Sequence, residues 1–478
     1  MFISVGVALL SGRTARILAE PGCTIHEFKK LAQKELRATG ITALITSAGQ
    51  LLHDSCTLET AGVVNGDTLS ATVQQATIAS SRESSAFACI CADGSVVTWG
   101  DPVCGDSTSV QKQLKDVRHI QASTYAFAAL RREGKVVSWG IVFNGGDCSA
   151  VQDKLQNVQH LESTSYAFAA IRADGSVVCW GLHEYGGDTE NVASELKEVR
   201  EITGSATAFA AIRADGQVIT WGDLACGGDS SAVKEQLRHV KEVRCTAFAF
   251  AALRVDGQVV TWGGDCCGGD SSTVQPRLSS IVQLSSSACA FAAIRADGQV
   301  VTWGEPEGGG DCSLVQEQLH DVQQVKSTHR AFAAIRRDGS VVTWGDPNCG
   351  GDSRAVQDQL QGVQHVEGTQ AAFAAVKVNG HVVTWGDFAY GSDSSAVQEQ
   401  LCDVQRIYAS QKAFASILLS GQIVTWGDPR CGGDSSRVQS QLIAGCLVKD
   451  RECDTIEACV GEKLSSCRTN VFLAQPCL

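Results

Sequence analysis

Several features that mark common classes of protein are missing from this sequence of 478 residues. No stretch approaches the roughly 18 consecutive apolar residues that a membrane-spanning helix needs. The net charge is −13 and the sequence has no run of lysine and arginine. Duplex nucleic acid and anionic membranes are therefore poor candidate partners. Only 7 prolines and a 44% hydrophobic content indicate packed structure rather than disorder. We therefore expect a folded protein of the cytoplasm, or of the nucleus, that binds other proteins.

Motifs for catalysis and cofactor binding are absent too. The 10 histidines are scattered, and the sequence has no Gly-x-Ser-x-Gly, no P-loop and no His-x-x-x-His pair. The sequence thus predicts no catalytic residue, no cofactor, no metal site and a non-enzymatic role. The apolar start, Phe2 to Leu10, lacks the basic residues and the longer apolar run of a signal peptide, and we interpret it as a strand.

The 21 cysteines do not form the pattern of a disulfide framework, because most of them stand singly. Five share one position just before a repeated Gly-Asp step, either as a row of exposed thiols or, as we favour, as small space-filling residues: Cys104, Cys226, Cys267, Cys349 and Cys431. Five more lie in a tail from residue 444, without any C-x-x-C pair that would favour zinc: Cys446, Cys453, Cys459, Cys467 and Cys477.

The dominant feature is an internal repeat. Nine tryptophans are spaced by 40 residues once and by 41 thereafter: Trp99, Trp139, Trp180, Trp221, Trp262, Trp303, Trp344, Trp385 and Trp426. Nine phenylalanines, from Phe87 to Phe414, keep the same frame. Periods of this size are typical of propellers and solenoids, whose units have no core of their own. We interpret both aromatic rows as core packing rather than as a ligand cage.

One unit can be followed from residue 288 onwards. Asp297-Gly298 is typical of a tight turn, and the flanking segments Ala290 to Ile294 and Gln299 to Trp303 predict a hairpin. A Gly-Gly-Asp step follows, and its aspartate is expected to cap a helix of about two turns, as Asp393 would for residues 394–401. One carboxylate per repeat cannot supply the six or more oxygens that calcium takes, so capping is preferred to metal binding. Arginines before the turn, such as Arg295, are expected to pair with neighbouring acids.

The hairpin core from Ala292 to Gly304, with Asp297-Gly298 and Trp303-Gly304, resembles the RCC1 repeat. It is also similar to the RCC1-like regions of large HERC-type ubiquitin ligases, although no ligase catalytic domain follows. The resemblance implies nine RCC1-like repeats over residues 76–443 in a mainly β propeller or toroid. The repeat is shorter than the family's usual unit and lacks its Asn-x-x-Gly-Gln-Leu-Gly stretch, so an open β-rich solenoid with one short helix per repeat is the alternative.

Residues 1–75 are organised differently. A second strand near Thr14–Ala19 precedes a helix capped by Thr24, whose predicted apolar face is Ile25, Phe28, Leu31, Ala32 and Leu36. With the later Thr57-Leu58 and Gly66-Asp-Thr68-Leu69 steps, this series resembles a ubiquitin-like β-grasp domain. The resemblance implies a protein-docking module, and it maps the usual binding patch to Leu10, Thr46 and Thr72. No terminal diglycine follows, and a simple cap on the first repeat remains an alternative.

The variable residues after each Trp-Gly pair are the candidate binding surface, because loops on a rigid scaffold commonly bind partners. Six of them are predicted to gather on one rim: Asn144, Tyr185, Glu307, Asn348, Tyr390 and Arg430. Neutral variation is the other interpretation. We expect an interaction scaffold or adaptor, with ubiquitin-system components among its candidate partners. Alternatives are the substrate-recognition part of ubiquitin ligation and, as the RCC1 resemblance implies, nucleotide exchange on a small GTPase, for which the uniform units offer no protruding wedge.

Overall fold

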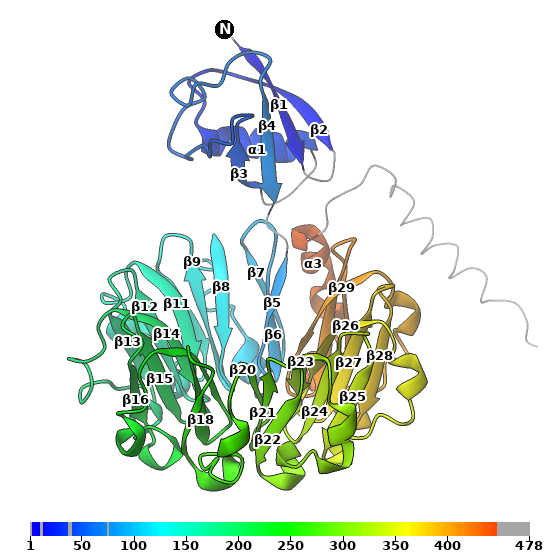
Figure 1. The fold of residues 1–478 in the computed structure, drawn as a ribbon. Coiled ribbons are helices and arrows are strands. Elements are labelled where there is room, and N and C mark those ends of the chain that lie inside the picture. Colours follow the sequence, from blue (N-terminus) through cyan, green and yellow to red (C-terminus); the bar gives the residue numbers. More distant parts are fainter. Residues whose placement is uncertain (1, 10–12, 37–40, 74–75, 447–478) are drawn as a thin grey trace, which may run out of the picture. The chain divides into compact units, whose positions relative to one another are not determined.

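The computed structural model describes residues 2–9, 13–36, 41–73 and 76–446 (Figure 1). These residues fall into two compact units, one ending at Val73 and the other ending at Cys446. The predicted patch residue Leu10 and the cysteine-rich tail after Cys446 lie outside the described residues. Within the described ranges, no helix is long and apolar enough to cross a membrane.

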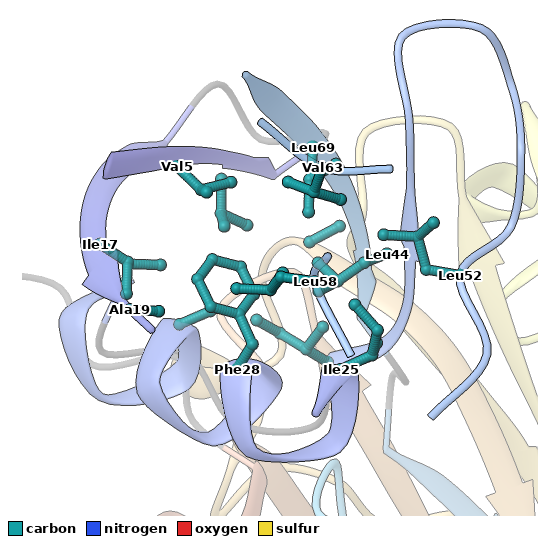
Figure 2. Close-up of a cluster of buried hydrophobic side chains, with 14 of the residues drawn as sticks. Val5, Ile17, Ala19, Ile25, Phe28, Leu44, Leu52, Leu58, Val63 and Leu69 are labelled. Carbon is teal, nitrogen blue, oxygen red and sulfur yellow. The ribbon is translucent and has the colours of Figure 1, made fainter. Parts of the chain in front are cut away.

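The N-terminal unit is a four-stranded sheet with one helix. Its elements are β1 (Ile3–Leu9), β2 (Thr14–Ala19), α1 (Ile25–Leu36), β3 (Ile41–Ile45) and β4 (Thr68–Val73). The strand order is β2-β1-β4-β3, with β1 and β4 parallel and the other pairs antiparallel. Figure 2 shows the buried side chains of α1, with Phe28 in their middle, facing those of the strands. This is the β-grasp arrangement that the sequence predicted.

The helix α1 begins as predicted, but one residue of its predicted apolar face is exposed. Thr24 and Glu27 make a capping box, in which the Thr24 amide donates to the Glu27 carboxylate (3.0 Å) and the Glu27 amide donates to Thr24 Oγ1 (3.2 Å). Leu31, predicted on the apolar face, is 39% exposed. Lys29 is buried there instead, because its aliphatic stem packs inward while its Nζ reaches Asp54 Oδ1 at 2.5 Å.

The second unit contains nine three-stranded antiparallel sheets, one per repeat, with the second strand always in the middle. The first strands are β5 (Thr77–Ala79), β8 (Val117–Ala122), β11 (Val158–Ser163), β14 (Val199–Gly204), β17 (Val240–Cys245), β20 (Ile281–Ser286), β23 (Val322–Ser327), β26 (Val363–Gly368) and β29 (Val404–Ala409). The middle strands are β6 (Ala86–Ile90), β9 (Ala126–Arg131), β12 (Ala167–Arg172), β15 (Ala208–Arg213), β18 (Ala249–Arg254), β21 (Ala290–Arg295), β24 (Ala331–Arg336), β27 (Ala372–Lys377) and β30 (Ala413–Leu418). The third strands are β7 (Val96–Gly100), β10 (Val136–Gly140), β13 (Val177–Gly181), β16 (Val218–Gly222), β19 (Val259–Gly263), β22 (Val300–Gly304), β25 (Val341–Gly345), β28 (Val382–Gly386) and β31 (Ile423–Gly427).

Short helical turns follow the strands. Those directly after the third strand are α2 (Pro102–Gly105), η1 (Val142–Asn144), η3 (His183–Tyr185), η4 (Leu224–Cys226), η6 (Asp265–Cys267), η8 (Pro306–Gly310), η10 (Pro347–Cys349), η12 (Phe388–Tyr390) and η14 (Pro429–Cys431). Further along come η2 (Ser149–Val151), η5 (Ser231–Val233), η7 (Gln275–Arg277), η9 (Ser313–Gln318), η11 (Gln357–Gln359), η13 (Gln398–Gln400), η15 (Ser436–Val438) and α3 (Gln439–Cys446).

The two-turn helix predicted after the Gly-Gly-Asp step does not form in most repeats; the sixth has the six-residue 3₁₀ helix η9 and the ninth continues from η15 into α3. Between Asp393 and Leu401 only η13, a single 3₁₀ turn, forms. Asp393 does cap, but it caps a tight turn, in which its carboxylate accepts the amide of Ser395 (2.9 Å). The segment then supplies inward side chains such as Leu401, which is fully buried, instead of a regular helix.

Each repeat buries its apolar face against the next repeat. Within a sheet, Phe291 lies opposite Trp303 and their rings stack with centroids 5.1 Å apart. The small side chains of the middle strand, such as Ala290 and Ala292, pack against Phe332 and Trp344 of the following repeat in one buried cluster. The alanines let neighbouring sheets approach closely, so the cores lie between repeats, as in other repeat proteins.

The nine repeats close into a ring. Trp99 of the first repeat donates from Nε1 to the carbonyl of Gly432 in the ninth (3.1 Å), and Phe87 and Trp99 share a core with Ala413 and Ala415. A belt of backbone hydrogen bonds also runs from the loop of one repeat to the next, and the Gln411 amide continues it to the Ser84 carbonyl (2.8 Å). The predicted fold class, mainly β with a β-grasp domain and a toroid of nine repeats, is confirmed.

Candidate protein-interaction surfaces

The six predicted rim residues all lie in the helical turns that follow the third strands, which we call the rim turns. They occupy two different positions. Glu307, Asn348 and Arg430 are four residues after the tryptophan and are exposed. The remaining three are one residue further along and half-buried: Asn144, Tyr185 and Tyr390. Only the first position therefore presents its whole side chain to a partner.

The geometry of a rim turn follows from its sequence. Asp346 accepts the Asn348 amide (2.9 Å), which starts η10, and Gly350 ends the turn with a φ of 88°. A Cβ on Gly350 would lie 2.7 Å from the Phe373 ring of the next repeat. The repeated Asp and Gly thus hold the turn against its neighbour, and the residues between them are free to vary.

The half-buried position has a structural role that the sequence did not reveal. The carbonyl of Tyr390 accepts a hydrogen bond from Thr369 Oγ1 (2.9 Å), and the carbonyl of Tyr185 accepts one from Thr164 Oγ1 (3.1 Å). Cys104, Cys267 and Cys431 are buried at the same position. The cysteine row is therefore mainly space-filling, and it is no row of exposed thiols.

Two predicted residues, Glu307 and Asn348, line a groove of about 1000 Å³ between the sixth and seventh repeats. Leu314, 98% exposed, lies beside them. Carboxylates dominate the groove, and the Arg354 guanidinium lowers the pKa of Asp352 to about 2 through hydrogen bonding. An acidic groove with one exposed leucine suits a partner segment that carries basic and apolar side chains.

Arg430 lies in a second groove, of about 610 Å³, where the ninth repeat meets the first. Asp101, Asp434, Arg430 and Arg437 all line it, so its charges balance. Arg430 donates to Asp428, which lowers the pKa of that carboxyl relative to its usual value against the opposing effect of partial burial. The structure therefore places three of the six predicted residues in grooves between repeats and keeps the grooves separate.

Sequence reasoning missed an aromatic cluster on the same edge of the ring. Tyr166 packs between Tyr125 and Tyr185, with ring centroids 5.9 and 4.8 Å away, and Phe143 of the second rim turn is 78% exposed. The backbone joins these loops to the rim, since the Ile141 amide donates to the Tyr125 carbonyl (2.9 Å). Tyrosine is enriched in protein interfaces. The available signal was that three of the five tyrosines of the chain fall within the second and third repeats.

The β-grasp unit presents a different surface from the one predicted. Thr46 and Thr72 are half-buried, and Thr46 Oγ1 accepts the Gln50 amide (3.1 Å). Three apolar side chains are much more exposed, namely Phe2 (64%), Leu18 (69%) and Val64 (61%). Leu18 pairs with Ser4, whose amide donates to the Asn65 side chain, so the backbone positions of the three residues lie near Ser4. We call them the Phe2 patch.

The described residues also bear on metal and charge. No group of three or more histidine, cysteine or acidic side chains in the described ranges could hold a metal ion. The arginines before the hairpin turns pair with neighbouring acids as predicted, with Arg295 reaching Asp297 at 3.2 Å.

No protein-family model and no curated protein matches this chain. Similar solved structures include the ectodomain of the receptor kinase CR4 from Physcomitrella patens, at 14% identity over 58% of this chain and 74% of that one, with a TM-score of 0.38. Prp20p from Saccharomyces cerevisiae has 13% identity over 59% and 86%, with a TM-score of 0.36. The N-terminal ubiquitin-like domain of the 4931431F19Rik protein has 24% identity over 15% and 75%, with a TM-score of 0.14.

Proposed function

We propose that this protein is a non-catalytic interaction scaffold, in which the rim of the ring holds one partner and the β-grasp unit docks to another. The observation that carries the proposal is the division of labour within a repeat. Side chains that recur in every repeat, such as Trp303 and Phe332, pack between repeats, whereas exposed side chains such as Phe143 and Asn348 vary from one rim turn to the next. A ring of this kind is a rigid carrier for variable contacts.

The Phe2 patch supports the second half of the proposal. Three large apolar side chains, each more than 60% exposed, stand at neighbouring backbone positions of a unit of about 70 residues. Exposed apolar clusters of this kind commonly mark protein-binding sites. A link with the ubiquitin system rests on the ubiquitin-like organisation of this unit, and it makes a role as adaptor or substrate-recognition subunit part of the proposal.

Three variants of the full chain test the proposal. Phe143→Asp alters the rim, Leu18→Asp alters the Phe2 patch, and Val255→Asp alters an equally exposed position (74%) at the opposite edge of the ring. Crosslinking and mass spectrometry in cells should show that the first two variants each lose a different set of partners and the third loses none. Loss of all partners in one variant, or of none in both, would contradict bridging.

Ubiquitin transfer assays test the part of the proposal that gives this protein no catalytic activity. With activating and conjugating enzymes present and this protein as the sole ligase, we expect transfer at background level. A ubiquitin thioester on any cysteine of the chain would overturn the assignment.

A further inference from the structure

The first repeat differs from the others in the loop between its first two strands. Nine positions separate Ile78 from Phe87, whereas seven separate the equivalent Val325 and Phe332 in the seventh repeat. We call residues 80–85 the crossing loop. The two extra residues let this loop leave its own repeat.

The crossing loop reaches repeats on another part of the ring wall. Arg82 Nη1 donates to the carbonyl and the Oγ of Ser327 and to the carbonyl of Thr328, each at 2.9 Å. Glu83 contacts His329 Nε2 at 2.5 Å and accepts a hydrogen bond from Gln370 at 3.3 Å. The loop therefore links the first repeat with the seventh and eighth, and it forms one wall of a central cavity.

This cavity has a volume of about 900 Å³ and is lined by the first strands of the fifth to ninth repeats together with the crossing loop. Four permanent cations line it: Arg82, Arg244, Lys326 and Arg406. Serine hydroxyls and Tyr408 supply further polar groups. Glu367 is the one carboxylate among these described lining residues. The size is within the range of small-molecule sites.

Carboxylates contact two of the four lining cations, Lys326 and Arg244. Glu367 is shared by Lys326 (2.7 Å) and His365 (3.0 Å), and Arg244 pairs with Glu242 at 2.6 Å. The side chain of Arg406 makes no hydrogen bond or ion pair with any described residue.

Arg82 binds neutral oxygens through Nη1 alone. Burial is the largest influence on its pKa and lowers it from the usual value, against the weaker opposing field of Glu83. Two cations, Arg82 and Arg406, thus face the cavity without a carboxylate in contact, in a protein whose net charge is −13.

We propose that the central cavity binds a small organic polyphosphate, with Arg406 and the free edge of Arg82 as its principal anchors. Guanidinium groups bind phosphate through paired, charge-assisted hydrogen bonds. A compact ligand with several phosphates would contact cations on separate strands at once, and serine hydroxyls would donate to its remaining oxygens. This inference is independent of the scaffold function, because the cavity lies inside the ring and the rim turns do not line it.

The test uses the full-length protein and two probes, inositol hexakisphosphate and inorganic pyrophosphate. Isothermal titration calorimetry should give one binding site, and affinity should fall as sodium chloride is raised, because salt screens the attraction. Arg406→Glu should weaken binding at least tenfold, and Arg406→Lys should restore part of it. Arg354→Glu carries the same charge change at an exposed rim position and should bind as the unaltered protein does.

Arg82→Ala removes a contact between repeats as well as an anchor, so its thermal unfolding is measured beside its affinity. Weakened binding in Arg406→Glu with an unchanged melting temperature supports the site. Equal losses in Arg406→Glu and Arg354→Glu, several weak sites per chain, or no heat with either probe at millimolar concentration would each overturn it. A single site for pyrophosphate with none for inositol hexakisphosphate would overturn the assignment to organic polyphosphates.

Discussion

The junction between the first and second repeats and the junction between the sixth and seventh are built from the same residue types, yet they differ in one respect. At the latter, Trp344 Nε1 donates to the Gly309 carbonyl at 3.0 Å. At the former, the first repeat is one residue short after Gly105, and Trp139 Nε1 has no acceptor among the described residues. The Trp139 ring still stacks on Phe127 at 5.3 Å. The deletion therefore removes hydrogen bonding and leaves packing in place.

The second repeat also holds other buried polar atoms without a described partner, on His119, Thr124 and Ser138. By contrast, the junction between the ninth and first repeats, where the chain is not continuous, has its tryptophan hydrogen bond in full. The junction that lacks its tryptophan hydrogen bond is thus one repeat away from the point of closure. Buried donors without acceptors cost about 1–3 kcal/mol each.

The variant with the largest expected effect on stability disrupts the intact junction between the sixth and seventh repeats. Gly309→Ala puts a Cβ 2.5 Å from the Phe332 ring at a φ of +96°, and we expect a loss of about 3 kcal/mol in the free energy of unfolding. Gly308→Ala in the same turn is the matched control, since its nearest contact, at 3.3 Å, is the movable Glu305 carboxylate. Urea unfolding should separate the two variants, and equal losses would contradict this account of the junction.

Glu162 of β11 and Glu367 of β26 occupy equivalent positions in the first strands of their repeats, and they extend the comparison to the pH dependence of stability. Burial raises the pKa of Glu162 to about 7, whereas hydrogen bonding by His365 and the charge of Lys326 leave the pKa of Glu367 below its usual value despite burial. The native state disfavours ionised Glu162, so its cost is absent below the unfolded pKa near 4.5 and complete above 7. Glu162→Gln should therefore stabilise the protein by about 2 kcal/mol at pH 8.5 and have little effect at pH 4.

Glu367→Gln should act in the opposite sense at pH 8.5, because it removes a favourable charge whose contribution is lost only as the pH falls through its low pKa. Thermal unfolding of both variants at the two pH values checks the pair. A destabilised Glu162→Gln at pH 8.5 would show that this carboxylate is better paired than its surroundings indicate.

The tryptophan hydrogen bond itself can be isolated by replacing each indole with a phenyl ring. Trp344→Phe and Trp139→Phe lose similar packing, but only the first leaves a carbonyl, that of Gly309, without its donor. We expect Trp344→Phe to cost about 1.5 kcal/mol more than Trp139→Phe in urea unfolding. Equal costs would mean that the indole hydrogen bond adds no net stability.

The smallest expected effect repairs the weak junction. A glycine inserted after Gly105 restores the 41-residue spacing, and it should raise the free energy of unfolding by about 1 kcal/mol. The same insertion combined with Trp139→Phe should give no gain, because the donor is gone. A gain of equal size in both backgrounds would assign the effect to the loop rather than to the indole.

Sequence reasoning predicted what depends on local patterns and failed where distant contacts decide. The Asp297-Gly298 hairpin, the stacked Phe291 and Trp303, and the helix after Thr24 follow from turn chemistry and periodicity, and all are present. The helix predicted for residues 394–401 does not form, because burying Leu401 between repeats stabilises the protein more than forming a short isolated helix would.

The candidate sites were predicted only in part for the same reason. The structure has turns where the sequence placed the variable residues, after each Trp-Gly pair, but the sequence could not separate exposed Asn348 from half-buried Tyr390. That difference depends on how the preceding aspartate and following glycine orient the turn. The contact of Arg82 with Ser327 spans 245 positions and has no counterpart in any local pattern. Such contacts need the ring to be closed before they exist.

Closure of the ring does not depend on strand exchange, because each sheet is built from three strands consecutive in sequence, including β5-β6-β7 and β29-β30-β31. Among the described residues, the ends of the array meet through side-chain contacts, such as that of Trp99 with the Gly432 carbonyl, and through the Gln411 to Ser84 backbone hydrogen bond. The repeats therefore have a cyclic order but no obligatory first member. A circularly permuted chain that opens between β22 and β23 and joins the ninth repeat to the first would keep every sheet whole, so the position of the termini is separable from the architecture.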